Sequence, residues 1–137
     1  METFKLKVVG SRRVFFEGEV KELILPIADG GLMGFLAHHS NVVAPIEYGE
    51  MTIKPLEGED IYAFIGSGFI EYFDNVATVV CISCQLPEEI DAERAEEAKQ
   101  RAEEELRQKH SLLEYHESQM NLARAMERLK IKNRHGM

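Results

Sequence analysis

The sequence predicts an α+β protein, in which an N-terminal antiparallel β-sandwich is followed by a C-terminal antiparallel two-helix hairpin. Residues 1–87 alternate short β-branched and aromatic runs with turns rich in Gly, Pro and Asp, a pattern typical of many short strands. From residue 88 to residue 135 there is no Gly or Pro, and Ala, Glu, Arg, Lys and Leu dominate, as in helices. We therefore expect two parts, residues 1–87 and residues 88–137.

The expected strands follow runs in which apolar residues alternate with polar ones. Phe4, Leu6 and Val8 alternate with two lysines, which is typical of a half-buried strand. Turn signals such as Gly66-Ser67-Gly68 and Asp74-Asn75 separate later runs of this kind. The predicted strands cover residues 4–8, 14–18, 19–26, 41–46, 51–54, 61–65, 69–73 and 76–82.

The stretch from residue 29 to residue 40 is expected to be a loop, with three glycines, several apolar residues and two histidines. Glycines this close together indicate positive φ angles or a close approach of the backbone to another group. Either Phe35 and Leu36 turn inward at a tight corner, or the loop is a contact surface for another subunit. His38 and His39 are adjacent and would point apart on an extended chain, so we expect no metal there.

The two helices are separated by a capping signal. The first is expected to begin after Pro87 with Asp91 as its N-cap and to end near His110. Ser111 and Glu114 have the spacing of a capping box, so the second helix should follow after a short turn and run antiparallel. The first helix has a narrow stripe of small residues, whereas the second has larger ones: Ala92, Ala95, Ala98, Ala102 and Leu106 on the first, and Leu112, Tyr115, Leu122, Met126 and Leu129 on the second.

If these stripes pack against each other, little apolar surface is left to hold the hairpin on the sandwich. A large apolar side chain contributes about 1.5–3 kcal/mol when fully buried, and most such side chains are used between the two helices. We therefore expect the hairpin to be weakly docked and able to change position, which is the physical basis of a switch.

The charge pattern restricts the class of partner. The net charge of −8 argues against nucleic acid, which requires a basic surface. Residues 1–89 carry 6 basic and 14 acidic residues, whereas residues 111–137 carry 5 basic and 3 acidic ones. The basic tail is expected to meet an acidic partner, which includes the body of the chain itself. No apolar run approaches the roughly 18 residues needed to cross a bilayer, so no direct membrane insertion is expected.

No catalytic signature is present in the sequence. It lacks a phosphate-binding Gly-x-x-x-x-Gly-Lys, a Gly-x-Ser-x-Gly elbow and a His-Glu-x-x-His pair, so a binding module is expected rather than an enzyme. Cys81 and Cys84 are three positions apart and would point to opposite faces of a strand. We expect two small structural residues there, in preference to a metal site or a disulfide.

Four arginines form a candidate anion site on the helices. Arg94 and Arg101 share one face of the first helix, and Arg124 and Arg128 share one face of the second. In an antiparallel hairpin these pairs can converge into a triphosphate site. The other interpretation is two ordinary solvated faces, and the residue pattern alone favours that interpretation.

Several stretches occur in one order along nearly the whole chain. They are residues 4–9, 13–20, 25–26, 31–39, 66–71, Ile90-Asp91-Ala92-Glu93-Arg94-Ala95 and Ala123-Arg124-Ala125-Met126-Glu127-Arg128-Leu129. No single stretch is specific. In this order, with a β body and a terminal hairpin, the chain resembles the epsilon subunit of bacterial F-type ATP synthase.

The resemblance implies a ten-stranded sandwich and two helices in a non-catalytic subunit of the central rotor, peripheral at the cytoplasmic face of the cell membrane. Its implied partners are the gamma subunit, the c-ring and the alpha and beta catalytic subunits. It would help to couple ion translocation to ATP synthesis, and its helices would inhibit ATP hydrolysis. The residues implied to face the rotor are Gly31, Leu32, Met33, Gly34 and His39, and the basic residues implied to inhibit are Arg124, Arg128, Lys130, Lys132 and Arg134.

In some bacterial members of this family the folded hairpin binds ATP as a regulatory ligand, through an Ile/Leu-Asp-x-x-Arg-Ala motif and arginines on both helices. The matching residues here are Ile90, Asp91, Arg94, Ala95, Arg101, Arg124 and Arg128. Two residues depart from the family pattern. Glu117 is a carboxylate that would repel phosphate, and Leu32 replaces a common acid. A nucleotide-sensing module is therefore the alternative function, and no cofactor is required in either case.

Overall fold

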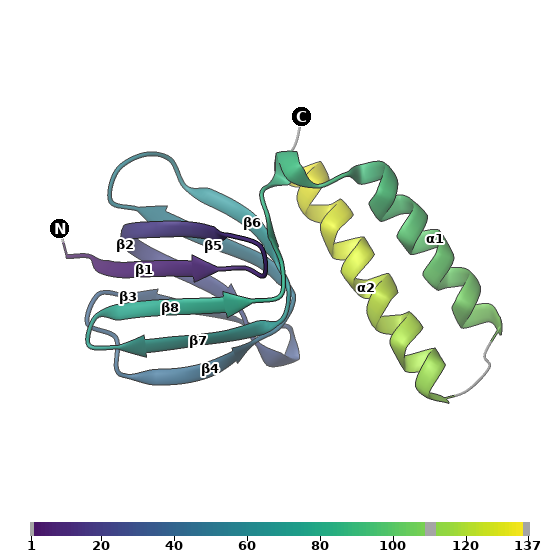
Figure 1. The fold of residues 1–137 in the computed structure, drawn as a ribbon, viewed down its shortest axis with the longest axis horizontal. Helices are drawn as coiled ribbons and strands as arrows, with labels where there is room; N and C mark the ends of the chain where they lie inside the picture. The colour runs from purple at the N-terminus through teal and green to yellow at the C-terminus, as the bar shows by residue number, and fades with distance from the viewer. Residues whose placement is uncertain (1, 109–111, 136–137) are drawn as a thin grey trace. The chain divides into compact units, whose positions relative to one another are not determined.

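The computed structural model contains two units, Met1–Leu86 and Pro87–Met137. It describes residues 2–108 and 112–135, without the side chains of residues 29, 108 and 112–116. Within these residues the first unit is built from strands and the second from two α-helices (Figure 1). The predicted class, a β-sandwich followed by a helical hairpin, is confirmed.

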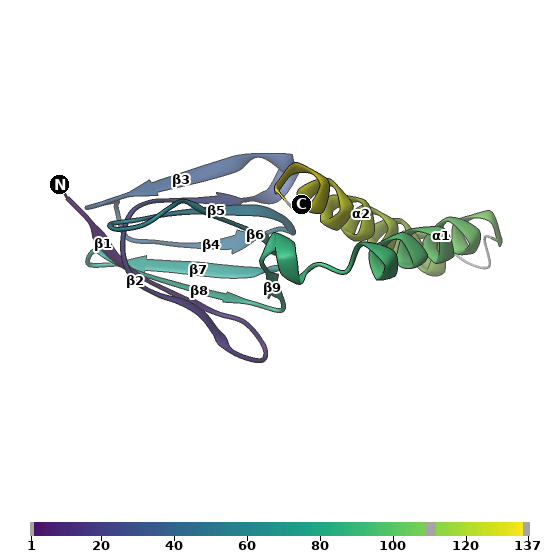
Figure 2. The same cartoon turned by 90° about the horizontal axis from the view of Figure 1, so that it is seen from above.

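Nine strands lie within the described part of the first unit, where the resemblance implied ten. They are β1 (Phe4–Val9), β2 (Val14–Pro26), β3 (Leu32–Leu36), β4 (Val42–Ile46), β5 (Gly49–Pro55), β6 (Ile61–Ile65), β7 (Gly68–Phe73), β8 (Val76–Cys81) and β9 (Cys84–Gln85). Their order is β4-β7-β8-β1-β2-β5-β6-β9, and β3 pairs with β2. Strands β1 and β8 pair in parallel, unlike the antiparallel pairing of the other described strands. Figure 2 shows β3 at one edge of this unit.

Strand β2 is continuous over 13 residues, so the predicted break near Gly18 is wrong. Its first half pairs with β1, where Gly18 stands opposite Leu6. Its second half pairs with β3 on one side and β5 on the other. One strand therefore belongs to both layers of the sandwich, and long-range pairing outweighs the weak strand preference of a single glycine.

The core of this unit lies between the two layers. Strand β1 alternates buried Phe4, Leu6 and Val8 with exposed lysines, as the sequence predicts. The largest fully buried side chains of the same cluster come from several strands: Tyr72, Phe4, Phe35, Leu6, Leu23, Leu25, Met51, Ile53, Ile65 and Ile70. The body is thus stabilised by its own apolar cluster.

The expected loop at residues 29–40 contains strand β3, so treating the whole stretch as a loop is wrong. A 3-10 turn over Ala28–Gly30 precedes the strand, and Gly30 has φ 74°. Gly31 and Gly34 do not have positive φ. The turn needs the conformational freedom of Gly30, and the other two glycines are compatible with an edge strand.

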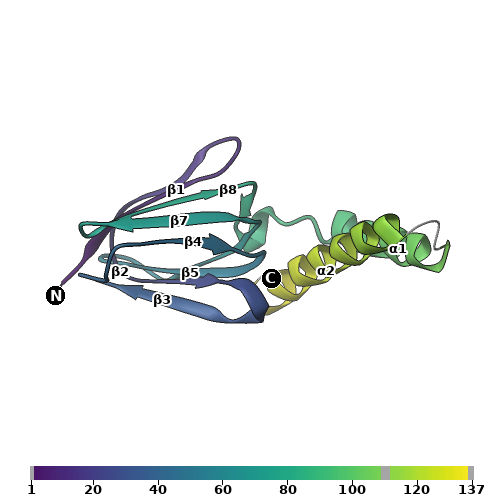
Figure 3. The same cartoon turned by 90° about the horizontal axis from the view of Figure 1, so that it is seen from below.

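The second unit consists of a 3-10 turn, η2 (Pro87–Glu89), and helices α1 (Ala92–Gln108) and α2 (Leu112–His135). Figure 3 shows the two helices side by side. Asp91 caps α1 as predicted, because its Oδ1 accepts a 3.1 Å hydrogen bond from the backbone N–H of Arg94. Ser111 of the expected capping box lies outside the described residues.

Among the expected stripe residues of α2 whose side chains are described, Met126 departs from the prediction; the side chains of Leu112 and Tyr115 lie outside the described ones. Met126 is 50% exposed, whereas Ala125 is 3% exposed and Ser118 is 3% exposed. Ser118 and Ala125 are seven residues apart, so they share one face of the helix. Small residues therefore occur in the buried part of both helices.

The two cysteines do not point to opposite faces of one strand, so that expectation is also wrong. Strand β8 ends at Cys81, the chain bends at Ile82, and β9 begins at Cys84. Cys81 belongs to the core cluster and Cys84 packs against it. The expectation of opposite faces fails because it assumes that the chain is extended from one cysteine to the other.

Candidate functional site

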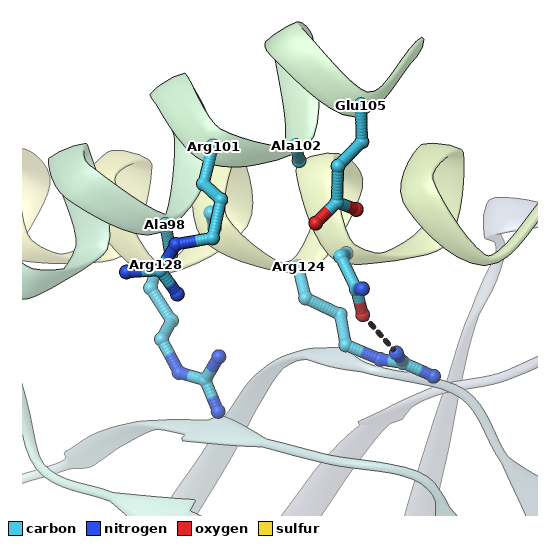
Figure 4. Close-up of a pocket in the computed structure, with 8 residues that line it drawn as sticks. Ala98, Arg101, Ala102, Glu105, Arg124 and Arg128 are labelled. Carbon is cyan, nitrogen blue, oxygen red and sulfur yellow. Dashed lines mark hydrogen bonds between the residues drawn. The ribbon is translucent and has the colours of Figure 1, made fainter. Parts of the chain in front are cut away.

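A groove between the two helices brings together three of the predicted arginines. It has a volume of about 180 Å³ and is lined by Ala98, Arg101, Ala102, Glu105, Asn121, Arg124, Ala125 and Arg128. In the view of Figure 4 the three arginine side chains extend toward the same edge of the hairpin. Pockets that hold whole small molecules usually measure about 300–1,000 Å³, so this groove suits a compact anionic group better than a complete nucleotide.

The spacing of residues along each helix determines which side chains face the groove. Arg101 and Glu105 are four residues apart on α1, and Arg124 and Arg128 are four residues apart on α2, so each pair shares a helix face. Small side chains between them, among them the buried Ala102 and Ala125, leave the space in which the longer side chains meet.

The guanidinium groups create a positive potential in the groove. The Nε of Arg124 is buried and has no hydrogen-bond partner among the described residues, while its Nη1 donates to Oδ1 of Asn121 at 3.4 Å. Burial lowers the pKa of Arg128, and the neighbouring charge of Arg124 lowers it further. The repulsion between the two like charges and the buried donor without a partner each raise the free energy of the empty groove. An anionic ligand would remove both costs, so the groove favours such a ligand.

Glu105 places a negative charge at the same groove. Its Oε2 accepts a 2.8 Å hydrogen bond from the hydroxyl of Ser118, which fixes the carboxylate between the helices. Among the residues that line the groove it is the acidic one. A carboxylate beside a phosphate site weakens phosphate binding by charge repulsion.

The predicted nucleotide motif lies at the start of α1 and does not line the groove. Ile90 and Ala95 are buried. Asp91 is engaged as the helix cap, and Arg94 is exposed. Arg94 precedes Arg101 by two helical turns, about 10 Å along the axis, so a ligand that contacts both must be extended.

Sequence reasoning missed Glu105 and Asn121 as groove residues. The available signal was their spacing: Glu105 follows Arg101 by four residues, and Asn121 precedes Arg124 by three. The expected contribution of Glu117 is not seen, since Glu117 is exposed and is not part of the groove lining.

The other predicted basic residues lie at the C-terminal end of α2. Lys130 and Arg134 are exposed, and Lys132 donates a 3.1 Å hydrogen bond from Nζ to the carbonyl oxygen of Pro87. Basic residues in the last turn of a helix interact favourably with its dipole. This bond also ties the end of α2 to the start of the same unit.

The predicted rotor-facing residues belong to strand β3 and the segment after it. Leu32 is 67% exposed, and Gly31 and Gly34 are exposed as well. Met33 is half-buried and packs against the core. The His39 ring packs at a tilt against Phe35, with ring centroids 4.9 Å apart, and against Tyr72, with centroids 5.4 Å apart. His39 therefore has a packing role, and Leu32 is the member of the set that offers apolar surface.

An exposed apolar face on the sandwich was not predicted. On the outer side of β7 and β8, Phe69 pairs with Val80 and Phe73 pairs with Val76. These four side chains are 37–57% exposed, and Val43 of the adjacent strand β4 is 70% exposed. We call these five residues the outer apolar face. The polar pair Glu71 and Thr78 lies between the two apolar pairs, so the face is interrupted at its centre. Exposed apolar side chains gathered on one side of a sheet are typical of a protein interaction site.

Among the described residues, no group of three or more His, Cys, Asp or Glu side chains is arranged to hold a metal ion. In the same residues, neither helix combines the length and the hydropathy that a membrane span needs.

Comparisons with known proteins agree along the whole chain. The family described as ATP synthase, Delta/Epsilon chain, beta-sandwich domain matches residues 3–86, and its long alpha-helix domain matches residues 88–133. The ATP synthase epsilon chain of Ruminiclostridium cellulolyticum is 42% identical over 134 residues, which is 98% of each chain. That of Caldanaerobacter subterraneus subsp. tengcongensis is 41% identical over 135 residues, 98% of this chain and 96% of the relative.

Solved structures share the fold. A chain in the Euglena gracilis mitochondrial ATP synthase OSCP/F1/c-ring structure matches with a TM-score of 0.78 and 20% identity, over 91% of this chain and 78% of that chain. A chain in the Tetrahymena thermophila mitochondrial ATP synthase central stalk/c-ring structure matches with a TM-score of 0.71 and 9% identity, over 96% and 97% of the two chains. Given the sequence matches to both of its parts, the chain belongs to the family of ATP synthase epsilon chains.

Proposed function

We propose that the chain is a non-catalytic subunit of the central stalk of an F-type ATP synthase, which helps to couple ion translocation to ATP synthesis. The observation that carries this proposal is the 42% identity to an ATP synthase epsilon chain over 98% of the length. On this proposal the chain is peripheral at the cytoplasmic face of the membrane. Its partners are the gamma subunit, the c-ring and the alpha and beta subunits.

The β unit offers two surfaces for these partners. The outer apolar face is suited to a stable contact with gamma, because a rotor subunit must stay attached while torque passes through it. Leu32 and Leu36, which are 67% and 58% exposed, offer a second apolar contact suited to the c-ring.

Inhibition of ATP hydrolysis is assigned to the basic end of α2. Lys130 and Arg134 are exposed there and can meet acidic segments of the catalytic subunits. The test is to assemble the complex with the intact chain, with a chain that ends at Leu86, or with a Lys130→Gln/Arg134→Gln chain. ATP hydrolysis should rise in the second and third complexes, while an Arg107→Gln control on α1 should behave like the parent. Equal hydrolysis in all four complexes would refute the inhibitory role.

A second candidate function is regulatory ATP binding, in which the helix groove holds phosphate groups of ATP and not the whole nucleotide. Its supporting observation is the group of three arginines, with the buried Nε of Arg124 lacking a partner among the described residues. Calorimetry should show heat of ATP binding to the parent and a clear loss of affinity for Arg101→Gln. Arg107→Gln, which does not line the groove, is the matched control. Absence of heat at millimolar ATP would eliminate this function.

A further inference from the structure

A pair of cysteines lies where the chain passes from β8 to β9. Cys81 is opposite Gly68 of β7, and Cys84 is opposite Ile65 of β6. Each cysteine is therefore held in a fixed register by a neighbouring strand.

The two-residue connection between the cysteines is itself held by the backbone. The N–H of Ile82 donates to the carbonyl oxygen of Ser67 at 3.0 Å. The N–H of Gly66 donates to the carbonyl oxygen of Ser83 at 2.9 Å. Both ends of this turn are consequently fixed by the same short segment between β6 and β7.

Both cysteines contact the same apolar cluster. Cys81 is 4% exposed within the core cluster, and Cys84 is half-buried and packs against that cluster. The Cys84 side chain forms a hydrogen bond with the Cys81 thiol, whose Sγ also donates to the carbonyl oxygen of Val9 at 3.6 Å. The bond with Cys84 lowers the pKa of the Cys81 thiol, against the opposing effect of burial. Thiolate is the reactive form in disulfide exchange.

We propose that Cys81 and Cys84 are a redox-sensitive pair that small-molecule disulfides, such as oxidised glutathione, convert into an intramolecular disulfide. The thiolate of Cys84, the more accessible of the two, attacks one sulfur of the oxidant, whose S–S bond breaks and releases one glutathione thiolate. The Cys81 thiolate then attacks Sγ of Cys84, forms the internal S–S bond and releases the second glutathione. The protein loses two electrons and two protons, and the oxidant is reduced to two thiols.

The bond would reinforce the shortest strand of the sandwich. Strand β9 has two residues and is paired with Phe64 and Ile65 of β6. A disulfide from Cys84 to the end of β8 anchors this strand covalently just before Pro87, where the helical unit begins. Reduction by a dithiol restores the original pair.

The test treats the folded full-length chain with excess oxidised glutathione and follows it by intact-mass and peptide mass spectrometry. The expected product has lost two hydrogen atoms, carries no glutathione and contains a Cys81–Cys84 linked peptide, which dithiothreitol reverses. Stable glutathione on both cysteines, a disulfide-linked dimer or no reaction would overturn the proposal.

Single variants separate the two steps. Cys81→Ser should stop at a glutathione adduct on Cys84, because no second thiol can displace it. Cys84→Ser should react at least tenfold more slowly, because the remaining thiol is buried. Equal reaction rates of the two variants, each shown by circular dichroism to be folded, would contradict the assigned order of attack. If either variant does not fold, amide hydrogen exchange of the parent tests the proposal instead. The backbone amides of residues 84–85 should exchange more slowly in the oxidised form than in the reduced form. Equal exchange in the two forms would refute the anchoring of β9.

Discussion

The hydroxyl of Ser118 donates a 2.8 Å hydrogen bond to Oε2 of Glu105, which joins the first third of α2 to the last turn of α1. Ser118 is 3% exposed, so its hydroxyl depends on this bond in place of water. The bond also holds a negative charge beside Arg101, Arg124 and Arg128. One contact therefore affects both the stability of the helical unit and the electrostatics of its groove.

Replacing Ser118 with Ala should lower the free energy of unfolding of the helical unit by about 1 kcal/mol, the usual net contribution of a hydrogen bond. Chemical denaturation followed by helical circular dichroism measures this change. Gln119→Ala, at an exposed neighbouring position, is the control and should have little effect. An equal loss in both variants would show that the bond to Glu105 is not responsible, because Ala has a higher helix propensity than either Ser or Gln.

Replacing Glu105 with Gln should strengthen the binding of anions such as ATP or tripolyphosphate by roughly threefold to tenfold. The change removes a negative charge from the groove but keeps an oxygen for Ser118, and each tenfold corresponds to about 1.4 kcal/mol. Calorimetry of the parent and of Glu105→Gln gives the ratio. Glu104→Gln removes the same charge at an exposed position outside the groove lining, so an identical gain there would point to net charge alone.

Replacing Phe69 with Ser should weaken assembly with the gamma subunit without unfolding the chain. Phe69 belongs to the outer apolar face and is 44% exposed, so its loss removes apolar contact area and leaves the core intact. Leu56→Ser is the control, because Leu56 is 40% exposed but lies outside that face. Co-purification with gamma and thermal melting of the free chain measure the two effects, and equal retention of gamma would contradict the assigned surface.

Replacing Tyr72 with Phe should destabilise the β unit by roughly 1–3 kcal/mol, because its hydroxyl donates to the carbonyl oxygen of Leu36 at 2.8 Å in a part-buried site. Burial raises the pKa of Tyr72 above the ordinary value of 10.0. The folded state therefore retains this proton at a pH where the unfolded state loses it, so stability is complete below about pH 10 and decreases above it.

The variant tests that alkaline dependence directly. Denaturation midpoints of the parent should fall above pH 10, and those of Tyr72→Phe should fall less over the same range. Tyr62→Phe, which removes another tyrosine from the sandwich, should keep the parental slope. The same slope in all three chains would mean that Tyr72 has no part in the decline.

Features set by neighbours in the sequence were predicted well. Asp91 was expected to cap the first helix, and the helix begins at Ala92 because the cap needs only the nearby N–H of Arg94. The convergence of Arg101, Arg124 and Arg128 was one of two interpretations of helical spacing, and the residue pattern alone favoured the other, two solvated faces. Weak docking of the hairpin on the sandwich stays a prediction.

Features set by distant pairing were not predicted. Strand β3 exists because five of its residues pair with β2, although the glycines suggested a loop. The outer apolar face was missed because each of its strands was considered separately. The sequence did contain a signal for this face. In β7 and β8 apolar residues occur on both sides of the strand, as they do in strands that are covered on both sides. Only the register of β4, β7 and β8 shows that these residues lie on one side of the sheet.

The buried part of the helical unit includes Ala102 of α1 and Ala125 of α2, which are 2% and 3% exposed. Burial of one methylene-sized group contributes about 0.8 kcal/mol. Separating the helices at these two alanines therefore loses little hydrophobic free energy. Leu122 and Leu129 are only half-buried in the closed form. We therefore expect that a protein which covers both leucines completely gains more hydrophobic free energy than the alanines lose, and that it favours an opened helical arm over the folded pair.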